Sequence, residues 1–414
     1  MLDVYLYEER VGRLWEDENL GILFQYGDRA LAEPERYRLS LSLPVREEAY
    51  QRLGRNFFEN LLPEGDAREA LAAATKFDRS DVTGLLGEVG GECAGAVSLW
   101  PPSSQPPNPE AWTYQDIHLT DVLEAVEGRA GARSASRLSA RQSLSGVHNK
   151  LVVLRRGERL LLPAAGAPGN VIVKRAQSAY DGITANELAC LGLLEATGAP
   201  VAVASSLVIN DHVMLESRRY DRRESSDGAL RRLHQEDLCQ ATGRSPRAKY
   251  HEQGGPTFAD VQTILRQNSL SPIEDLQHLV RWMFANFLVG NCDGHAKNLS
   301  LLYEDEGIRL APFYDVVSTD VYEGLDRTFA LHVGGRGTPA AFDAYGLRKY
   351  ARSVAMNPKK VRELGEETAD AVESSASDVF DEVAGPTGHP PVLDRIHALV
   401  VTRLAELRGV LQDI

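Results

Sequence analysis

The sequence has few cysteines and no long apolar run. Its 414 residues include four cysteines, which are scattered and form no CxxC pair. Isolated thiols of this kind behave as small apolar side chains in a reducing compartment, so we expect a cytoplasmic protein. No stretch of about 18 apolar residues occurs, and the first ten residues carry charges where a signal peptide needs an apolar segment. The sequence therefore predicts no membrane span.

The sequence also has fewer basic residues than acidic residues. Lysine and arginine number 45 against 59 aspartates and glutamates, which gives a net charge of -14. This balance argues against a surface devoted throughout to nucleic acid and favours a basic protein partner. Residues 348–362 form a local basic run. We interpret this run as a solvated helix face, with contact to nucleic acid or to an acidic partner as the alternative.

One segment near the middle of the chain has a pattern typical of phosphoryl transfer. Asp293 precedes Asn298 by five residues, which is the spacing of the base and the metal-binding amide in the H-R-D-x-x-x-x-N loop of protein kinases. Asp315 stands where a second metal-binding aspartate would be expected. Carboxylate and amide oxygens suit Mg²⁺, and Asp293 would accept the proton of an incoming hydroxyl. The pattern predicts phosphotransfer with Mg²⁺ held by Asn298 and Asp315.

The surroundings of this segment support that interpretation. Residues 279–289 are apolar on most faces, which predicts a buried helix that ends at Gly290. The alternative is an ordinary turn, because Asp-Gly is a strong turn dipeptide. A D-x₄-N pair directly after a buried helix, with another aspartate after a strand-like segment, favours the phosphotransfer site.

Two upstream features fit the same chemistry. Residues 170–174 predict a strand that ends in Lys174, and residues 186–194 open an amphipathic helix that contains Glu187. A strand lysine followed by a helix glutamate is the kinase ion pair that directs the lysine to the ATP phosphates. The small-residue loop 143–150 lacks the GxxxxGK[ST] pattern, but its backbone N–H groups and Lys150 could line a phosphate cradle. A solvated loop and an edge-strand lysine are the alternative interpretations.

Several motifs in order make the chain resemble the HipA family, the toxin kinases of bacterial type II toxin–antitoxin modules. The segments that carry the resemblance are 57–65, 143–150, 219–223, 235–240, 249–250, 293–298 and 312–315. The resemblance implies an α+β, two-lobed protein-kinase-like fold with an α/β N-terminal part and a mainly helical C-terminal lobe. With the proline-rich linker at 101–109, we divide the chain into an N-terminal α/β module (1–105), a connector and ATP-binding lobe (106–255) and a helical catalytic lobe (256–414).

The resemblance also assigns roles by position. Asp293 is the expected catalytic base, Lys174 the phosphate lysine, and Asn298 and Asp315 the metal ligands. The remaining expected ATP contacts are Ser145, Gly146, Val147, His148, Asn149, Lys150, Arg218, Arg219, Tyr220, His295, Lys297 and Tyr314. Family members often carry glutamate at the hinge position of Arg218. The family autophosphorylates on a loop serine, here Ser143 or Ser145, where added negative charge would repel the ATP phosphates.

The implied function is an ATP- and Mg²⁺-dependent protein serine/threonine kinase that acts as a growth-arresting toxin. An aminoacyl-tRNA synthetase is the kind of substrate that the resemblance suggests. A DNA-binding antitoxin would neutralise the toxin and bring the contact with operator DNA. Two alternatives stay open. One is a phosphoinositide-kinase-like enzyme acting on lipids or small molecules, because D-x-H-x-x-N also resembles that loop, and the other is an inactive kinase-fold corepressor.

Overall fold

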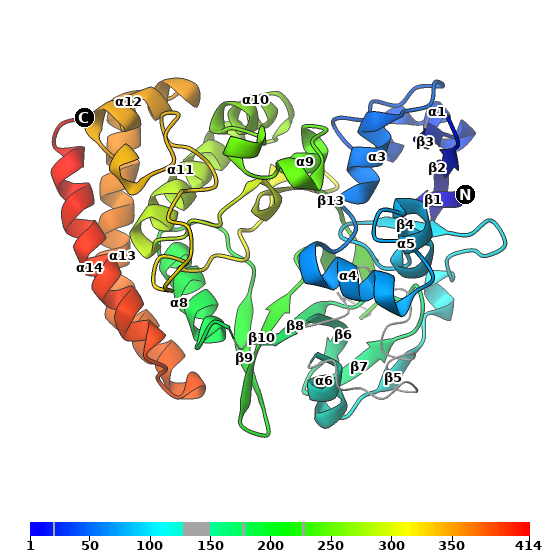
Figure 1. Ribbon diagram of the computed structural model, residues 1–414, viewed down its shortest axis with the longest axis horizontal. Helices are drawn as coiled ribbons and strands as arrows, with labels where there is room; N and C mark the ends of the chain where they lie inside the picture. The colour runs from blue at the N-terminus through cyan, green and yellow to red at the C-terminus, as the bar shows by residue number, and fades with distance from the viewer. Residues whose placement is uncertain (20, 127–149, 176–178, 226–227) are drawn as a thin grey trace. The chain divides into compact units, whose positions relative to one another are not determined.

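The structure is a computed structural model that describes residues 1–19, 21–126, 150–175, 179–225 and 228–414. It forms two compact units, whose elements are labelled in Figure 1. The first unit contains Met1–Arg175, Ile209–His212 and Glu216–Pro246, and the second contains Ala176–Val208, Val213–Leu215 and Arg247–Ile414. Among the helices of the described residues, none has both the length and the apolar character needed to cross a membrane.

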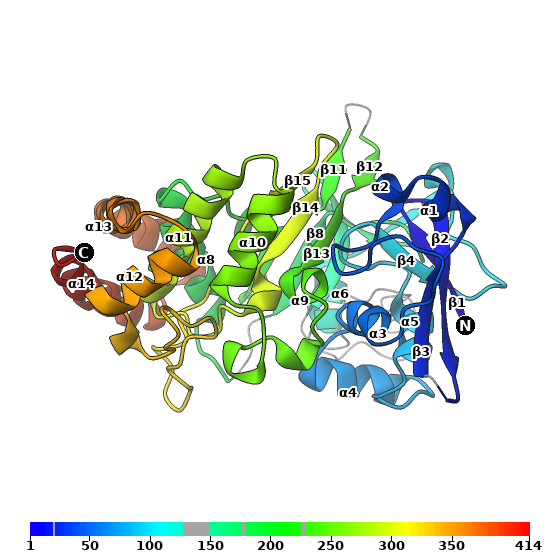
Figure 2. The ribbon, with the colours of Figure 1, turned by 90° about the horizontal axis from the view of Figure 1, so that it is seen from above.

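A four-stranded antiparallel sheet opens the first unit. Its order is β3-β2-β1-β4, with β1 (Leu2–Leu6), β2 (Glu9–Asp17), β3 (Gly21–Tyr26) and β4 (Val97–Trp100). Every residue of the inner strand β1 is buried. Five helices accompany the sheet, and Figure 2 shows α3 and α5 beside it: α1 (Asp28–Ala32), α2 (Pro34–Tyr37), α3 (Arg52–Glu59), α4 (Gly65–Ala74) and α5 (Val82–Val89). The fully buried rings of Phe24 and Phe58, with centroids 5.1 Å apart, join β3 to α3.

The strict alternation at residues 38–43 predicts a strand, and this prediction is wrong. Leu39 and Leu43 are buried, but the segment is a turn closed by a single bridge between Ser40 and Leu43. The side chain of Ser40 contacts protein as well, because Ser40 Oγ donates to Glu236 Oε2 at 2.5 Å. Alternation with a period of two reports only that successive side chains face opposite sides. Here both sides are protein, so the pattern arises without strand pairing.

A second group of strands follows in the same unit. β5 (Tyr114–Asp116), β7 (Arg159–Pro163), β6 (Lys150–Arg156) and β8 (Val171–Arg175) pair antiparallel in that order, and α6 (Leu119–Val126) packs against β6 and β8. This confirms the predicted strand at 170–174, which ends one residue later at Arg175. The apolar runs 151–155 and 159–162 on either side of a turn predict a hairpin, and β6 and β7 confirm it. Short elements complete the unit: β11 (Arg222–Glu224), β12 (Leu230–Arg232), β13 (His234–Asp237) and α9 (Leu238–Ala241).

His234 should make the stability of the first unit depend on pH. Its side chain is buried, its Nε2 lies 2.8 Å from Leu39 O, and burial lowers its pKa from 6.5 to about 4. The unfolded chain therefore binds more protons than the folded chain between pH 6.5 and about 4, and the folding free energy from the neutral imidazole is lost as the pH falls through this window. We expect the free energy of unfolding to decrease by about 3 kcal/mol across this pH window.

Urea unfolding of the chain and of His234→Gln at a series of pH values would measure this effect. The variant should be less stable at pH 7, and its stability should vary less between pH 6.5 and 4. The exposed His212, changed to glutamine in the same way, should leave the pH profile of the parent chain unchanged. Parallel profiles for the parent chain and His234→Gln would show that His234 is not the titrating group.

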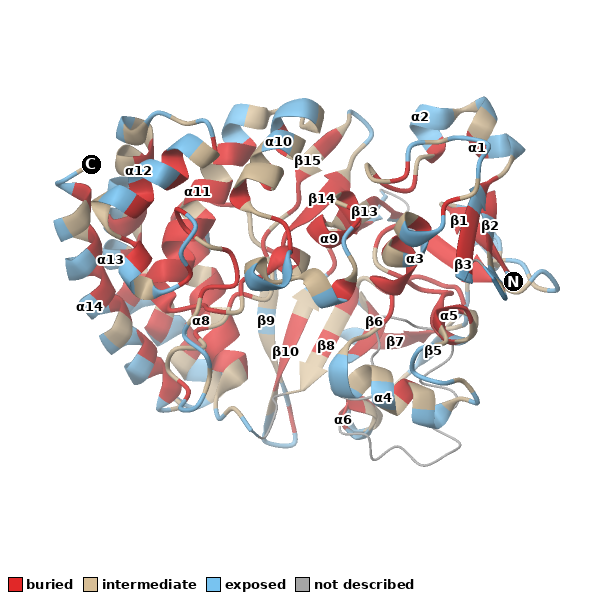
Figure 3. Cartoon of the chain, turned by 45° about the horizontal axis from the view of Figure 1, so that its top comes forward, coloured by how far each residue is buried: buried red, intermediate tan, exposed pale blue. Residues whose placement is uncertain are grey.

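The second unit is mainly helical. Its helices are α8 (Ile183–Ala196), α10 (Phe258–Asn268), α11 (Pro272–Val289), α12 (Ala344–Ser353), α13 (Pro358–Thr387) and α14 (Val392–Leu411), with a small antiparallel pair β14 (Ser300–Tyr303) and β15 (Ile308–Leu310). The chain passes between the units at β9 (Ala204–Ile209) and β10 (His212–Arg218). Helix α11 is buried along most of its length, whereas α13 and α14 expose one face (Figure 3). The acidic segment 366–382 and the amphipathic segment 392–411 each predict a helix from the sequence, and α13 and α14 confirm both.

Candidate active site

The loop that carries Asp293 begins at the end of α11. Gly290 ends the helix in a left-handed conformation, with φ of 69°, as the sequence predicts. A Cβ atom at this position would lie 2.7 Å from Leu399 Cδ2 and 2.8 Å from Asp320 Cβ, so glycine is needed for both conformation and space. The carbonyl of Gly290 accepts a hydrogen bond from Thr319 N at 3.1 Å. The loop is therefore anchored where it leaves the buried helix.

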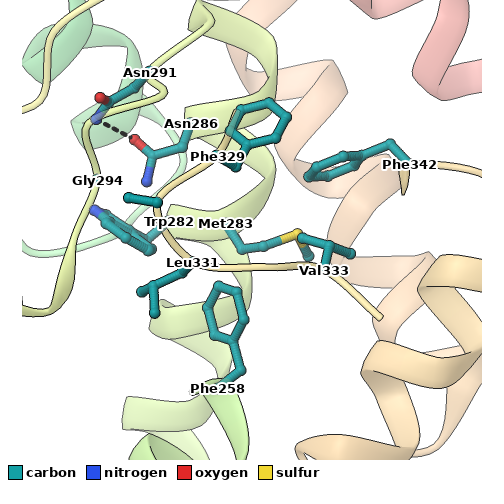
Figure 4. A pocket seen from close by; sticks show the side chains of 11 residues that line it. Phe258, Trp282, Met283, Asn286, Asn291, Gly294, Phe329, Leu331, Val333 and Phe342 are labelled. Carbon is teal, nitrogen blue, oxygen red and sulfur yellow. Dashed lines mark hydrogen bonds between the residues drawn. The ribbon is translucent and has the colours of Figure 1, made fainter. Parts of the chain in front are cut away.

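Two asparagines fix the backbone before Asp293. Asn291 Nδ2 donates to Asn286 Oδ1 at 2.8 Å, and Asn291 Oδ1 accepts from Asp293 N at 3.0 Å (Figure 4). Gly294 lies against α11, because a Cβ atom there would be 3.1 Å from the ring of Trp282. The cavity beneath the loop has a volume of about 20 Å³, far below the roughly 300 Å³ of a small-molecule site. It is a packing gap, and the loop rests on a filled core.

A tyrosine orients the Asp293 carboxylate. Tyr250 Oη donates to Asp293 Oδ1 at 2.7 Å, and its ring meets the ring of His295 edge to face with centroids 5.3 Å apart. His295 is buried, and the next residue donates its backbone N–H to Lys249 O at 3.2 Å. Sequence reasoning gave Tyr250 no role, although the Lys249-Tyr250 pair belongs to the resemblance. The presence of that pair in the resemblance was the sequence signal that could have identified Tyr250 as a residue of the site.

Asn298 joins the two acidic segments. Its Nδ2 donates to Asp315 O at 3.3 Å and to Asp293 O at 3.5 Å, which turns its Oδ1 away from both carbonyls. Asp315 has φ of 57°, a left-handed conformation that is uncommon for a residue other than glycine and concentrates at functional sites. Tyr314 Oη donates to Lys297 O at 2.6 Å and lies 2.8 Å from Ser300 Oγ. The second unit thus brings the predicted residues Asp293, Asn298 and Asp315 together.

This donor set fits Mg²⁺. An amide oxygen and a carboxylate are hard oxygen ligands, and Mg²⁺ commonly takes one or two protein carboxylates together with substrate phosphates and water. The amide nitrogen of Asn298 is held by backbone carbonyls, so its oxygen is the atom that the side chain can offer. Asn298 and Asp315 are therefore the residues that would hold the metal.

Two predicted phosphate-binding lysines are paired in the first unit. Lys150 on β6 lies directly opposite Lys174 on β8 in the antiparallel register. Opposite residues of a sheet share a face, with Cβ atoms about 5 Å apart. The register therefore places both of the predicted phosphate-binding lysines on one face of the sheet.

The predicted adenine-side residues follow β10. Arg218 is exposed, and the half-buried Tyr220 donates from its hydroxyl to Gln235 Oε1. The guanidinium of Arg219 is buried and donates to Glu92 Oε1 at 2.5 Å and to Asp221 Oδ2 at 2.8 Å. The side chain of Arg219 is thus part of a structural network, and its backbone N–H donates to Asn170 O at 2.9 Å while its carbonyl accepts from Arg222 N at 3.3 Å.

That network consists of buried charges. Glu92 accepts hydrogen bonds from Arg219, from Arg222 Nη2 at 2.8 Å and from Arg232 Nη2 at 2.8 Å. Burial alone would raise the pKa of Asp221, but the neighbouring charges of Arg219 and Arg222 lower it to about 2. Burial likewise opposes ionisation of Glu92, and the surrounding guanidiniums lower its pKa. Sequence reasoning missed this cluster, since nothing in the sequence links residue 92 to the arginines.

Six predicted residues of the loop before β6 fall outside the described residues. They are Ser143, Ser145, Gly146, Val147, His148 and Asn149. Glu187 is buried on α8, and its neighbour Asn186 binds the backbone of Ser318 through both side-chain atoms, at 2.9 Å to the carbonyl and 2.7 Å from the N–H. This contact, which sequence reasoning did not foresee, ties α8 to the segment that follows Asp315.

Comparison with known proteins gives consistent family matches. Residues 2–100 match the HipA N-terminal domain, and residues 142–376 match the HipA-like C-terminal domain. A Sinorhizobium fredii protein named Y4mE, which its name groups with the kinases, is 33% identical over 392 residues, covering 92% of this chain and 93% of that protein. The Shewanella oneidensis serine/threonine-protein kinase toxin HipA is 26% identical over 307 residues, covering 71% of this chain and 70% of that protein.

A solved structure shares the fold. It is the Shewanella oneidensis MR-1 toxin–antitoxin complex of HipA, HipB and operator DNA, which matches with a TM-score of 0.83 and 21% identity. The match covers 100% of this chain and 99% of that chain. At this identity the likeness establishes the fold alone. The predicted α+β, protein-kinase-like fold is confirmed.

Proposed function

Because the chain belongs to the HipA family, we propose that it is a cytoplasmic protein serine/threonine kinase that uses ATP and Mg²⁺ and acts as the toxin of a type II toxin–antitoxin pair. The observation that carries the proposal is the assembly of Asp293, Asn298 and Asp315 around one loop. The Shewanella relative, named as a serine/threonine kinase toxin, supports the choice of protein hydroxyl as acceptor.

The residues divide the chemistry between them. Asp293 takes the proton of a serine or threonine hydroxyl, whose oxygen bonds to the γ-phosphorus of ATP while the bond from that phosphorus to the ADP oxygen breaks. Mg²⁺ held by Asn298 and Asp315 would supply positive charge to the phosphate oxygens. Lys150 and Lys174 would add further positive charge. Tyr250 keeps the Asp293 carboxylate in one orientation through its hydrogen bond.

The partner in this proposal is a basic, DNA-binding antitoxin of the HipB type. The net charge of -14 suits a basic partner, which would carry the contact with operator DNA. The basic run at 348–362 is partly neutralised in the structure, since Lys360 lies 3.4 Å from Glu363 and Arg362 lies 3.6 Å from Glu366. These pairs within α13 favour a solvated helix face for that part of the run.

The proposed protein substrate is an aminoacyl-tRNA synthetase or a similar translation component. The chain would also phosphorylate itself on Ser143 or Ser145 and thereby silence itself, because a phosphate there adds almost two negative charges beside the site for the ATP phosphates. The activity would then depend on the phosphorylation state of the purified protein. Intact mass should be measured before any assay.

Incubation of the phosphate-free chain with labelled ATP and Mg²⁺ tests the proposal. Label on a loop serine, absent when EDTA removes the metal, is the expected result. Label that appears only on added phosphoinositide vesicles would support the lipid-kinase alternative. A chain that binds ATP and transfers no label, either to itself or to a cell-free translation extract, would support the inactive corepressor.

A further inference from the structure

The first unit contains a second basic site, whose wall includes Arg218 and Arg219, two residues that were expected on the adenine side of ATP. It is a cavity of about 600 Å³ whose walls include five arginines and one glutamate: Arg155, Arg156, Arg218, Arg219, Arg222 and Glu224. This volume lies within the range of about 300 to 1,000 Å³ that is typical of sites for small molecules. So many arginines around one cavity are unexpected in a chain with a net charge of -14.

The carboxylates around the cavity do not balance its positive charge. Arg155 pairs with Glu216, the buried Arg219 and Arg222 both pair with Asp221, and the same two arginines share Glu92 with Arg232. Among the described residues, these neighbours and Glu224 give six arginines and four carboxylates. The six arginines include Arg156 and Arg218, which are exposed at the cavity. The described part of the site therefore carries an excess of positive charge.

Two guanidinium groups of the wall carry buried donors. The Nε atoms of Arg155 and Arg222 are both buried, and neither has a hydrogen-bond partner among the described residues. A buried donor without an acceptor costs about 1 to 3 kcal/mol, which is part of the cost of holding these guanidinium groups together. Burial, and then the charge of Arg219, lower the pKa of Arg222, which is the expected sign for a cation whose charge is incompletely balanced.

The cavity is separate from the two lysines predicted to hold ATP phosphates. Five positions along β6 separate Lys150 from Arg155. Side chains alternate along a strand, so an odd separation places these two on opposite faces, and the rise per residue places them about 17 Å apart. Lys174 shares the face of Lys150, since the two are opposite each other in the register. One phosphate group cannot occupy both sites.

We propose that this arginine cavity binds a small molecule that carries two or more phosphate groups. Guanidinium groups present paired donors that match phosphate oxygens, and several such groups around one volume select a ligand with several anionic centres. The volume of about 600 Å³ is that of a small-molecule site. The inference rests on the cavity alone and is independent of the kinase proposal.

Isothermal titration of the full chain with sodium tripolyphosphate, at low ionic strength and without divalent metal, tests the proposal. Binding of one molecule is expected, with citrate binding at least about tenfold more weakly because citrate carries fewer negative charges than tripolyphosphate. Arg156→Glu should weaken tripolyphosphate binding by about tenfold or more, since it reverses a charge of the wall. Lys174→Met should still bind the probe with the affinity of the parent chain.

Arg36→Glu is the matched control. Arg36 is exposed on α2 and is not part of the cavity wall, so its reversal should change the affinity by less than about twofold. Absence of binding would overturn the proposal. Equal weakening by Arg156→Glu and Arg36→Glu would also overturn it by showing general attraction, and loss of binding in Lys174→Met would assign the probe to the predicted ATP phosphate site.

Discussion

Replacement of Asp293 by asparagine is expected to lower the rate of phosphate transfer from ATP by about 10²- to 10⁴-fold. Asparagine keeps the shape of the side chain and can still accept the hydrogen bond that Tyr250 donates to Oδ1. It cannot take a proton from a hydroxyl group. The loop rests on α11 through Asn291 and Gly290, neither of which is changed, so the fold should be retained. Initial rates of label transfer and thermal unfolding would be measured on the same preparation.

Two further variants make this result interpretable. Tyr250→Phe removes one hydrogen bond to the carboxylate, so we expect a smaller decrease of about tenfold in kcat with the KM for ATP little changed. Asp378→Asn makes the same chemical change as Asp293→Asn at an exposed position of α13 and should leave the rate unaltered. A parental rate in Asp293→Asn would refute its assignment as the base.

Replacement of Glu92 by glutamine is expected to destabilise the first unit by about 3 to 5 kcal/mol. The carboxylate is 1% exposed and accepts hydrogen bonds from the three buried guanidiniums of Arg219, Arg222 and Arg232. Without its charge, Asp221 is the carboxylate that remains in the network, and three cations stay buried. Urea unfolding followed by circular dichroism should show a lower midpoint.

A surface pair provides the comparison. Glu69 and Arg79 are 2.8 Å apart, as close as Glu92 and Arg222, but their side chains are 60% and 64% exposed. Water and salt screen such a pair, so Glu69→Gln should cost at most about 1 kcal/mol. If the two glutamine variants were equally stable, burial would not be the reason that the Glu92 network contributes to stability.

The sequence by itself determined the features whose physical signals are local. The apolar residues before Gly290 predict a buried helix that ends there, because a glycine after a helix can adopt the left-handed conformation that stops it. Asp293 and Asn298 lie in one loop, so their spacing already limits how far apart they can be. Periodicity was equally informative for α13 and α14, which have an exposed and a buried face.

Only the tertiary structure decided which distant side chains meet. Tyr250 reaches Asp293 across 43 positions, and Arg219 reaches Glu92 across 127. The pairing of Lys150 with Lys174 depends on strand register, since a shift of one residue would turn a side chain to the other face. The alternation at residues 38–43 likewise did not determine the structure of the segment. A sequence pattern indicates that side chains face two sides, but it does not identify the residues that they contact on each side.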